Sequence, residues 1–365
     1  MTFRKLSSTA QWRTECCVLG NGLFGAAIAF ELATRGVDCC VVGASYGERQ
    51  YYYASHHDQS RLVRGWHTDA RWRSLVQQSL SKLRQLASWS EVPFFSEVPV
   101  LYGLDAAIAP RSSADLLPST LSVAGLLYQD RVGGVLNPLR YIGAMNTFAT
   151  RRTARIIRKA AHRVERMGGG YRITAGEHEI FASYIFDARG LYGRVAKSDD
   201  VITIGKITIN IAGGEHATPF GFVDFREEAG PFVNAYGCCA YAFQGNLPMT
   251  KYGFTEREPV KLPNIEAVNA WFAGDYARYP YLIAAQRWIE RFHRGSRAHV
   301  SIKPCAFTLT RNGYPIIRSE GHWLYVGGCN GMGAQSCQAL AEQTVSVWQE
   351  TVRGKHVTRS SSARQ

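Results

Sequence analysis

The sequence lacks several features that would place it in a simple functional class. Its 9 cysteines include no Cys-x-x-Cys pair and no Cys/His spacing typical of zinc. No continuous apolar run reaches the length of a membrane-spanning helix, and no repeat recurs along the 365 residues. These absences argue against a zinc protein, a membrane protein and a repeat protein. We expect no metal and no membrane partner.

Acidic residues are few relative to basic ones. The chain has 29 Asp and Glu against 42 Lys and Arg, which gives a formal net charge of +13. Such an excess is compatible with a nucleic-acid surface or an acidic partner. The basic residues are scattered, however, with short clusters only at Arg151 and Arg152 and between Arg155 and Arg158, and no zinc-finger, homeodomain or RRM signature accompanies them. We therefore expect no nucleic-acid partner.

The cysteines do not form a disulfide framework. Their count is odd, and six stand in adjacent pairs, at Cys16-Cys17, Cys39-Cys40 and Cys238-Cys239. Because adjacent residues of a strand face opposite sides, we interpret these pairs as small buried apolar residues. This usage favours a reducing, cytoplasmic environment.

The N-terminal region superficially resembles an export signal. Basic residues precede an apolar segment from Cys16 to Phe30, but Asn21, three glycines and Glu31 interrupt that segment. We therefore expect no export.

A glycine-rich turn separates a predicted strand from a predicted helix. Apolar residues 16–19 lead into Gly20-Asn21-Gly22-Leu23-Phe24-Gly25, apolar positions then recur with helical spacing, and residues 37–42 predict the next strand. In a dinucleotide fold, Gly20 forms the tight turn, Gly22 admits the pyrophosphate and Gly25 permits close helix packing. The alternative is a glycine-rich turn in an ordinary α/β domain.

The acidic residue that usually binds the adenosine ribose is missing. It is expected at the end of the second strand, but that strand ends Val41-Val42-Gly43-Ala44. Glu48 follows shortly afterwards and is the candidate substitute from a loop.

Further elements follow from hydrophobic spacing. We predict helices over 71–89, 139–148, 265–274, 284–292 and 335–348, and strands over 98–104, 171–174, 184–186, 201–209 and 323–326. The alternation over 201–209 predicts a sheet with one solvated face. We expect an α/β (α+β) fold in which a Rossmann-type FAD-binding domain (15–75, 131–212 and 303–350) interleaves with an antiparallel-sheet substrate domain (76–130 and 213–302), with flexible ends at 1–14 and 354–365.

The segment after the second strand carries a family resemblance. Its sequence, Ser55-His56-His57-Asp58-Gln59-Ser60-Arg61-Leu62-Val63-Arg64, resembles the Ser-His-His-x-x-x-Arg-x-x-Arg signature of the FAD-dependent amine oxidases. This D-amino-acid-oxidase-like group includes monomeric sarcosine oxidase and N-methyltryptophan oxidase. The resemblance implies that Ser55, His56, His57 and Arg61 lie beside FAD and that Arg64 binds a substrate carboxylate. A guanidinium suits both tasks, because it stabilises negative charge on reduced flavin and forks onto a carboxylate.

A second similar segment begins at Cys305. Cys305-Ala306-Phe307-Thr308-Leu309-Thr310, leading into Tyr314-Pro315, resembles the family segment whose cysteine is attached to the flavin. The resemblance implies FAD bound covalently through a thioether at Cys305. The basic neighbour Lys303 would favour the thiolate that this bond requires. A buried, unreactive cysteine is the alternative.

A third segment precedes the last predicted helix. The run from Gly327 to Gln335 resembles the family turn that receives the pyrimidine end of the flavin, so the resemblance implies FAD contacts at Gly328, Gly331, Met332, Gly333 and Gln335. The sarcosine-type enzymes have His and Lys where this chain has Met332 and Gln335, and their Lys helps to bind the substrate carboxylate. The departure favours a bulky, aromatic or carrier-tethered substrate, which leaves an acidic carrier protein open as a partner.

A looser similarity concerns Lys251. The segment Lys251-Tyr252-Gly253-Phe254 resembles the family's Lys-x-Gly-Tyr strand, whose lysine lies behind the flavin and promotes its reaction with O2. A cation at that place lowers the cost of electron transfer to O2. Nearby, Tyr236, Tyr241 and Phe243 either line an aromatic pocket or belong to the core.

These features together predict an FAD-dependent oxidase. It would remove a hydride from the C–N bond of a primary or secondary amine and give an imine and hydrogen peroxide. A flavin monooxygenase, an amine dehydrogenase with another electron acceptor and a catalytically idle flavoprotein are the alternatives.

Overall fold

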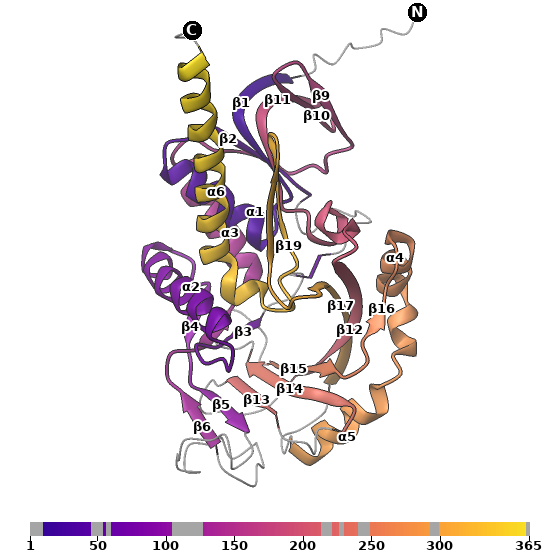
Figure 1. Ribbon diagram of the computed structural model, residues 1–365. Helices are drawn as coiled ribbons and strands as arrows, with labels where there is room; N and C mark the ends of the chain where they lie inside the picture. Colours follow the sequence, from indigo (N-terminus) through magenta and orange to yellow (C-terminus); the bar gives the residue numbers. More distant parts are fainter. Residues whose placement is uncertain are drawn as a thin grey trace, which may run out of the picture.

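Two sheets organise the chain, one above the other in the view of Figure 1. The computed structural model describes residues 10–44, 54–55, 60–103, 127–212, 221–225, 230–239, 249–292 and 299–362. The first sheet has the strand order β18-β19-β11-β1-β2-β8. Its strands are β1 (Ala10–Leu19), β2 (Cys39–Val42), β8 (Arg155–Ile157), β11 (His178–Asp187), β18 (Ile316–Glu320) and β19 (Trp323–Gly327). All neighbours pair in parallel except β18, which is antiparallel to β19, and the predicted Rossmann-type domain is confirmed.

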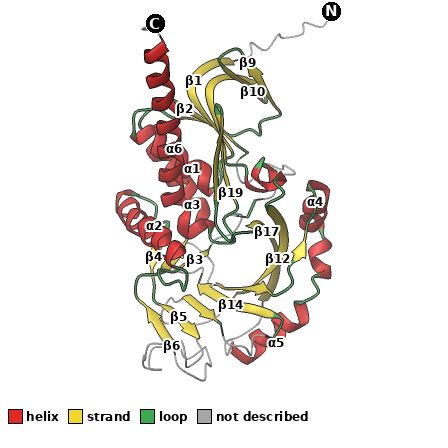
Figure 2. Cartoon of the chain, viewed as in Figure 1, coloured by secondary structure: helices red, strands yellow, loops and turns green. Residues whose placement is uncertain are grey.

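Helices cover one face of this sheet (Figure 2). They are α1 (Leu23–Thr34), α2 (Ala70–Trp89), α3 (Pro138–Thr150) and α6 (Gly333–Ser362). Two of these helices begin at a residue whose side chain caps the first turn. The Asp69 side chain accepts from two amides of the first turn of α2, and the Asn137 side chain accepts from Arg140 N at the start of α3. The hairpin of β9 (Arg163–Met167) and β10 (Gly170–Ala175) pairs antiparallel with the first half of β11, residues 178–182.

The adjacent cysteines of the first sheet pack on opposite faces. Cys16 and Cys39 belong to the helix-side core, while Cys17 and Cys40 belong to the core on the other face. All four are buried, as the interpretation of these pairs as small apolar residues predicts.

The second sheet is largely antiparallel and has the order β16-β12-β15-β14-β13-β5-β6, with β17 also paired to β12. Its strands are β5 (Val100–Gly103), β6 (Leu127–Asp130), β12 (Val201–Ala212), β13 (Gly221–Asp224), β14 (Phe232–Cys239), β15 (Met249–Glu256), β16 (Val260–Lys261) and β17 (His299–Thr310). Helices α4 (Ile265–Ala273) and α5 (Leu282–Phe292) lie along it in Figure 1. A small third sheet joins β3 (Arg61–Val63), β7 (Gly134–Leu136) and β4 (Phe95–Glu97).

Three expectations from the sequence differ from this structure. Strand β1 begins at Ala10, because residues 10–14 continue its pairing with β11, and α6 continues to Ser362, so regular structure reaches into both segments that were expected to be flexible ends. Strands β12 and β17, which the boundaries at 212 and 303 would place largely with the FAD-binding domain, pair in the second sheet. The expected solvated face over 201–209 is wrong for residues 204–209, which are all buried.

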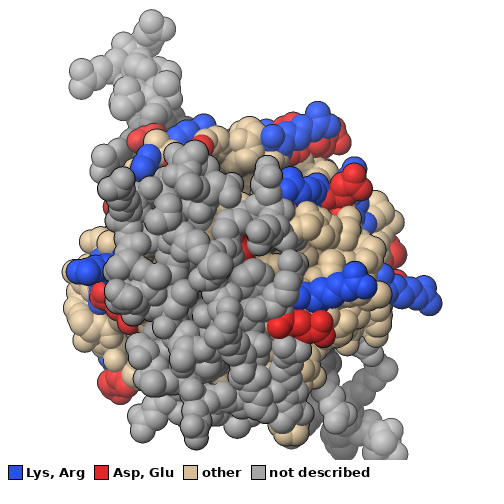
Figure 3. Space-filling model, turned by 90° about the horizontal axis from the view of Figure 1, so that it is seen from below, with Lys and Arg blue, Asp and Glu red and all other residues tan. Residues whose placement is uncertain are grey.

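The surface shows where the charges of the described residues lie. In the view of Figure 3, the described Lys and Arg side chains are interspersed with Asp and Glu and do not gather in one patch. None of the described helices combines the length and the apolar character needed to cross a membrane.

Candidate active site

The glycine-rich turn has the close contacts that a nucleotide-binding turn requires. Gly20 has a φ of +101°, and a Cβ there would lie 2.6 Å from the carbonyl oxygen of Ala188. A Cβ on Gly25 would lie 1.8 Å from the carbonyl oxygen of Gly20. Helix α1 begins after Gly22 with no side-chain cap and no acidic residue in its first turn. The first amides of the helix are therefore available to an anion, which fits a pyrophosphate.

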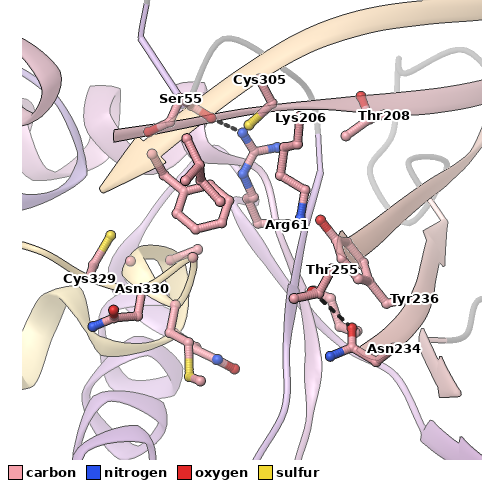
Figure 4. Close-up of a pocket in the computed structure, with 18 of the residues that line it drawn as sticks. Ser55, Arg61, Lys206, Thr208, Asn234, Tyr236, Thr255, Cys305, Cys329 and Asn330 are labelled. Atoms are coloured by element: carbon pink, nitrogen blue, oxygen red, sulfur yellow. Dashed lines mark hydrogen bonds between the residues drawn. The ribbon is translucent and has the colours of Figure 1, made fainter. Parts of the chain in front are cut away.

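A cavity of about 250 Å³ lies between the second sheet and two other segments, one containing Arg61 and Arg64 and the other running from Cys329 to Gln335 (Figure 4). Alternate side chains of β12, β14 and β17, and three residues of β15, line it. Its lining includes Ser55, Arg61, Arg64, Lys206, Thr208, Asn234, Tyr236, Lys251, Thr255, Glu256, Cys305, Phe307, Cys329 and the run 330–335. The polar face of β12, with Lys206 and Thr208, lines this cavity. On the other face, Ile207, Ile209 and Ile211 pack in a core with residues of α4 and α5.

Arg61 is held at one wall by backbone oxygens. Its guanidinium donates to the carbonyl oxygen of Ser60 at 3.0 Å and to that of Ser55. In Figure 4 the side chain projects into the cavity from β3, toward Cys305 and Lys206. A fixed cation at this place can stabilise negative charge on a bound group.

Arg64 contributes a second cation, and hydrogen bonds hold the backbone of this residue in place. Its guanidinium lies 5.4 Å from the ring centre of Phe225 and makes no hydrogen bond or ion pair with any described residue. Burial lowers the pKa of Arg64, although a guanidinium remains charged at neutral pH. The backbone N–H of Arg64 donates to Gln335 Oε1 at 3.2 Å. A positioned guanidinium with free donors is suited to bind a carboxylate.

A buried carboxylate fixes the segment that carries Arg64. Asp130 accepts from the backbone N–H groups of Gly65, Trp66 and Val132 at 2.7, 2.9 and 2.9 Å. These bonds tie the residues next to Arg64 to the end of β6. Sequence reasoning missed Asp130, because nothing in the local sequence links residue 130 to residue 65.

Two buried lysines project from neighbouring strands. Lys251, on β15, donates from Nζ to the carbonyl oxygen of Ser60 at 2.9 Å, which places its charge next to the Arg61 segment. Lys206, on β12, has its Nζ 5.4 Å from the ring centre of Tyr236 and 5.1 Å from that of Phe307. Sequence reasoning missed Lys206, since its place in an alternating strand predicted exposure to solvent.

The charge of Lys206 is maintained by polar neighbours. Burial acts to lower the pKa of Lys206, but Tyr236 and Glu256 outweigh that effect and the pKa is raised. Glu256 is itself buried. Its Oε1 accepts from the Tyr279 hydroxyl, and its Oε2 is shielded from solvent and accepts from no described residue. The cavity therefore contains a carboxylate as well as cations.

Cys305 lies directly opposite Lys206 in the register of β17 and β12. Its thiol lines the cavity, and its carbonyl oxygen accepts from Trp271 Nε1 at 3.1 Å. Cys329 is a second thiol in the lining, and burial raises its pKa. Of the two, Cys305 is the thiol that lies opposite the buried Lys206 cation.

The turn before α6 is held by Asn330, which has a φ of +51° between Gly328 (+68°) and Gly331 (+77°). Its side chain donates to the carbonyl oxygen of Gly328 at 2.7 Å and accepts from Thr310 N at 2.9 Å. The turn thereby presents Gly331 and Met332 to the cavity.

The structure brings together most of the site residues predicted from the sequence. Ser55, Arg61, Arg64, Lys251, Cys305, Gly331, Met332, Gly333 and Gln335 line one cavity, as does Tyr236. Gly20, Gly22 and Gly25 lie at the carboxyl edge of the first sheet, and neither they nor Gly328 line that cavity. His56, His57, Glu48, Tyr241 and Phe243 lie outside the described residues.

Comparison with known proteins agrees with this arrangement. Residues 15–346 match the family of FAD-dependent oxidoreductases, and the chain belongs to that family. The match therefore includes both the glycine-rich turn and the cavity. No curated protein sequence matches the chain significantly.

Solved structures with the same fold have low sequence identity to this chain. NikD, described as an unusual amino acid oxidase essential for nikkomycin biosynthesis, has a TM-score of 0.69 and 14% identity, over 90% of this chain and 94% of NikD. Glycine oxidase from Bacillus cereus has a TM-score of 0.64 and 12% identity, over 91% and 96%. L-proline dehydrogenase from P. horikoshii has a TM-score of 0.67 and 14% identity, over 94% and 95%. These similarities show the fold alone.

Proposed function

We propose that this FAD-dependent oxidoreductase is an oxidase of primary or secondary amines that carry a carboxylate. The observation that carries the proposal is the Arg64 guanidinium, which lines the cavity without a hydrogen-bond or ion-pair partner among the described residues. A half-buried cation without such a partner is unfavourable unless a ligand neutralises it. A substrate carboxylate would supply that charge.

Bound FAD would supply the hydride acceptor, and the protein would bind and orient the substrate. Arg64 would hold the carboxylate, since its backbone is fixed by Gln335 and by the bonds of Asp130 to the residues beside it. Arg61 would neutralise negative charge next to the cofactor. The products would be an imine and, with O2 as the electron acceptor, hydrogen peroxide.

Lys251 supports the oxidase assignment. Its ammonium is buried and fixed to Ser60, one residue from Arg61, so its charge lies at the wall of the cavity where the flavin would bind under this proposal. We infer that it assists electron transfer to O2. Cys305 would carry the flavin covalently, since it lies opposite the Lys206 cation and lines the same cavity.

The substrate would be larger than a small free amino acid. Gln335 and Met332 stand where the sarcosine-type enzymes have a lysine and a histidine, and Gln335 uses its oxygen to hold the Arg64 backbone. The remaining wall adds an aromatic ring at Tyr236 and a buried carboxylate at Glu256. A bulky, aromatic or carrier-tethered amine fits this mixed lining better than glycine or sarcosine.

The test is anaerobic flavin bleaching with a panel of primary and secondary amines, with and without a carboxylate. We expect bleaching by bulky carboxylated amines, followed on admission of O2 by one hydrogen peroxide per amine oxidised. Absence of bleaching by every amine would contradict the proposal. Bleaching with slow reoxidation by O2 would instead indicate the alternative, an amine dehydrogenase with another electron acceptor.

A further inference from the structure

The adenosine-ribose site of this chain lacks its usual acidic residue, and the structure shows why none can stand there. Leu19 and Val42 are paired at the carboxyl ends of β1 and β2, and Gly20 N donates to the Val42 carbonyl oxygen at 2.8 Å. The next residues, Asn21 and Gly43, therefore face each other at the edge where a dinucleotide binds.

The contact between these two residues is too close for a side chain at position 43. A Cβ on Gly43 would lie 2.3 Å from the backbone N of Asn21 and 2.8 Å from its Cβ. Separations below about 3 Å require something to shift, and here the nearest atom belongs to the backbone. Gly43 also donates its N–H to the Ile157 carbonyl oxygen at 3.1 Å, which holds it in place.

The Asn21 side chain starts 2.8 Å from the point where a Cβ of residue 43 would lie. Its carboxamide oxygen Oδ1 is shielded from solvent and accepts no hydrogen bond from any described residue. A buried acceptor without a donor costs about 1–3 kcal/mol, so such atoms normally have a partner. A ribose hydroxyl is a donor of the right kind, and the missing carboxylate would have accepted from the same group.

We propose that Asn21 replaces the acidic residue and accepts a hydrogen bond from a hydroxyl of the adenosine ribose of FAD. A neutral amide at position 21 would then take the place of the carboxylate at position 43. Gly43 makes this possible, because it has no side chain to collide with Asn21. This inference rests on FAD as the family cofactor and is independent of the substrate proposed above.

The test measures binding of FAD and FMN to apoprotein, in a Cys305→Ala background so that the flavin exchanges freely. FMN has the flavin and a phosphate but no adenosine ribose. Loss of one hydrogen bond corresponds to roughly a three- to tenfold change in Kd. We expect Asn21→Ala to raise the Kd for FAD by about that factor and to leave the Kd for FMN unchanged, whereas Asn21→Asp, which keeps an acceptor, should retain FAD affinity.

Two further variants separate the alternatives. Gly43→Asp should weaken both flavins and lower the melting temperature, because its Cβ has no room. Equal loss of FAD and FMN affinity in Asn21→Ala would show a structural role only and overturn the inference. It would also be overturned if Glu48→Gln, and not Asn21→Ala, reduced the preference for FAD. A selective loss of FAD in Asn21→Ala, in a protein that oxidises no amine, would support the ribose contact and refute the proposed function.

Discussion

Replacement of Arg64 by methionine tests the proposed carboxylate site. Methionine keeps an unbranched apolar side chain against Phe225 and removes the charge. The segment should keep its position, because the bond to Gln335 comes from the Arg64 backbone and the Asp130 carboxylate binds the amides of Gly65 and Trp66. The perturbation is therefore confined to the guanidinium.

The expected magnitude follows from the strength of a hydrogen bond to a charged group. A hydrogen bond to a charged group contributes about 1.5–3 kcal/mol, which corresponds to a change of about 10- to 150-fold in binding. Because a guanidinium can bind both carboxylate oxygens, Arg64→Lys should recover part of the loss and not all of it.

The assay compares a carboxylated amine with its methyl amide, which has the same bulk and no charge. We expect Arg64→Met to raise KM about 10- to 150-fold for the carboxylate and less than threefold for the amide, with a similar kcat. Equal effects on both substrates, or no effect on either, would refute the assignment. The thermal unfolding midpoint of the variant serves as the control for folding.

Three other predictions concern neighbouring residues. Acid precipitation should leave yellow colour in the pellet of the wild type and of Cys329→Ala, and should release it from Cys305→Ala; release from the wild type would contradict covalent attachment. Lys251→Met should slow reoxidation of the reduced enzyme by O2 on the order of 100-fold while anaerobic bleaching changes little, as measured by stopped-flow absorbance. Burial and the Arg64 charge lower the pKa of His67 to about 3 in the folded protein. A histidine of the unfolded chain has a pKa near 6.5, so as the pH falls the unfolded chain is protonated at this residue before the folded protein is. Stability from this group is full above about pH 6.5 and is lost as the pH falls toward 3, so urea unfolding at pH 5 should show about 2 kcal/mol less stability than at pH 7, and His67→Gln should lack that difference.

Much of the fold could be predicted because its signals are local. The order of strand, glycine turn and helix around Gly20 and Gly25 depends on residues close in sequence, and the structure confirms it. The spacing of leucines in 71–89 likewise predicts α2 within one residue. Such features need no knowledge of distant partners.

The polar wall of the site could not be predicted in the same way. Alternation along β12 correctly separates two faces, but it does not say what covers each of them. Lys206 and Thr208 are covered by loops from the other domain, so a face that the sequence assigns to solvent lines the cavity instead. The role of Asp130 and the role proposed for Asn21 depend in the same way on contacts with distant segments.

The interleaving of the chain has a consequence for its biosynthesis. Strand β1 pairs with β11, whose first residue lies at position 178, and β11 in turn pairs with β19, which begins at Trp323. Contacts between such distant segments form slowly, because a long loop must close before they stabilise anything. After the ribosome has added β11 and before it has added β19, one edge of the first sheet has no neighbour. Unpaired strand edges promote aggregation, so the yield of folded protein in a cell should depend on how fast β19 pairs with β11 once it has been synthesised.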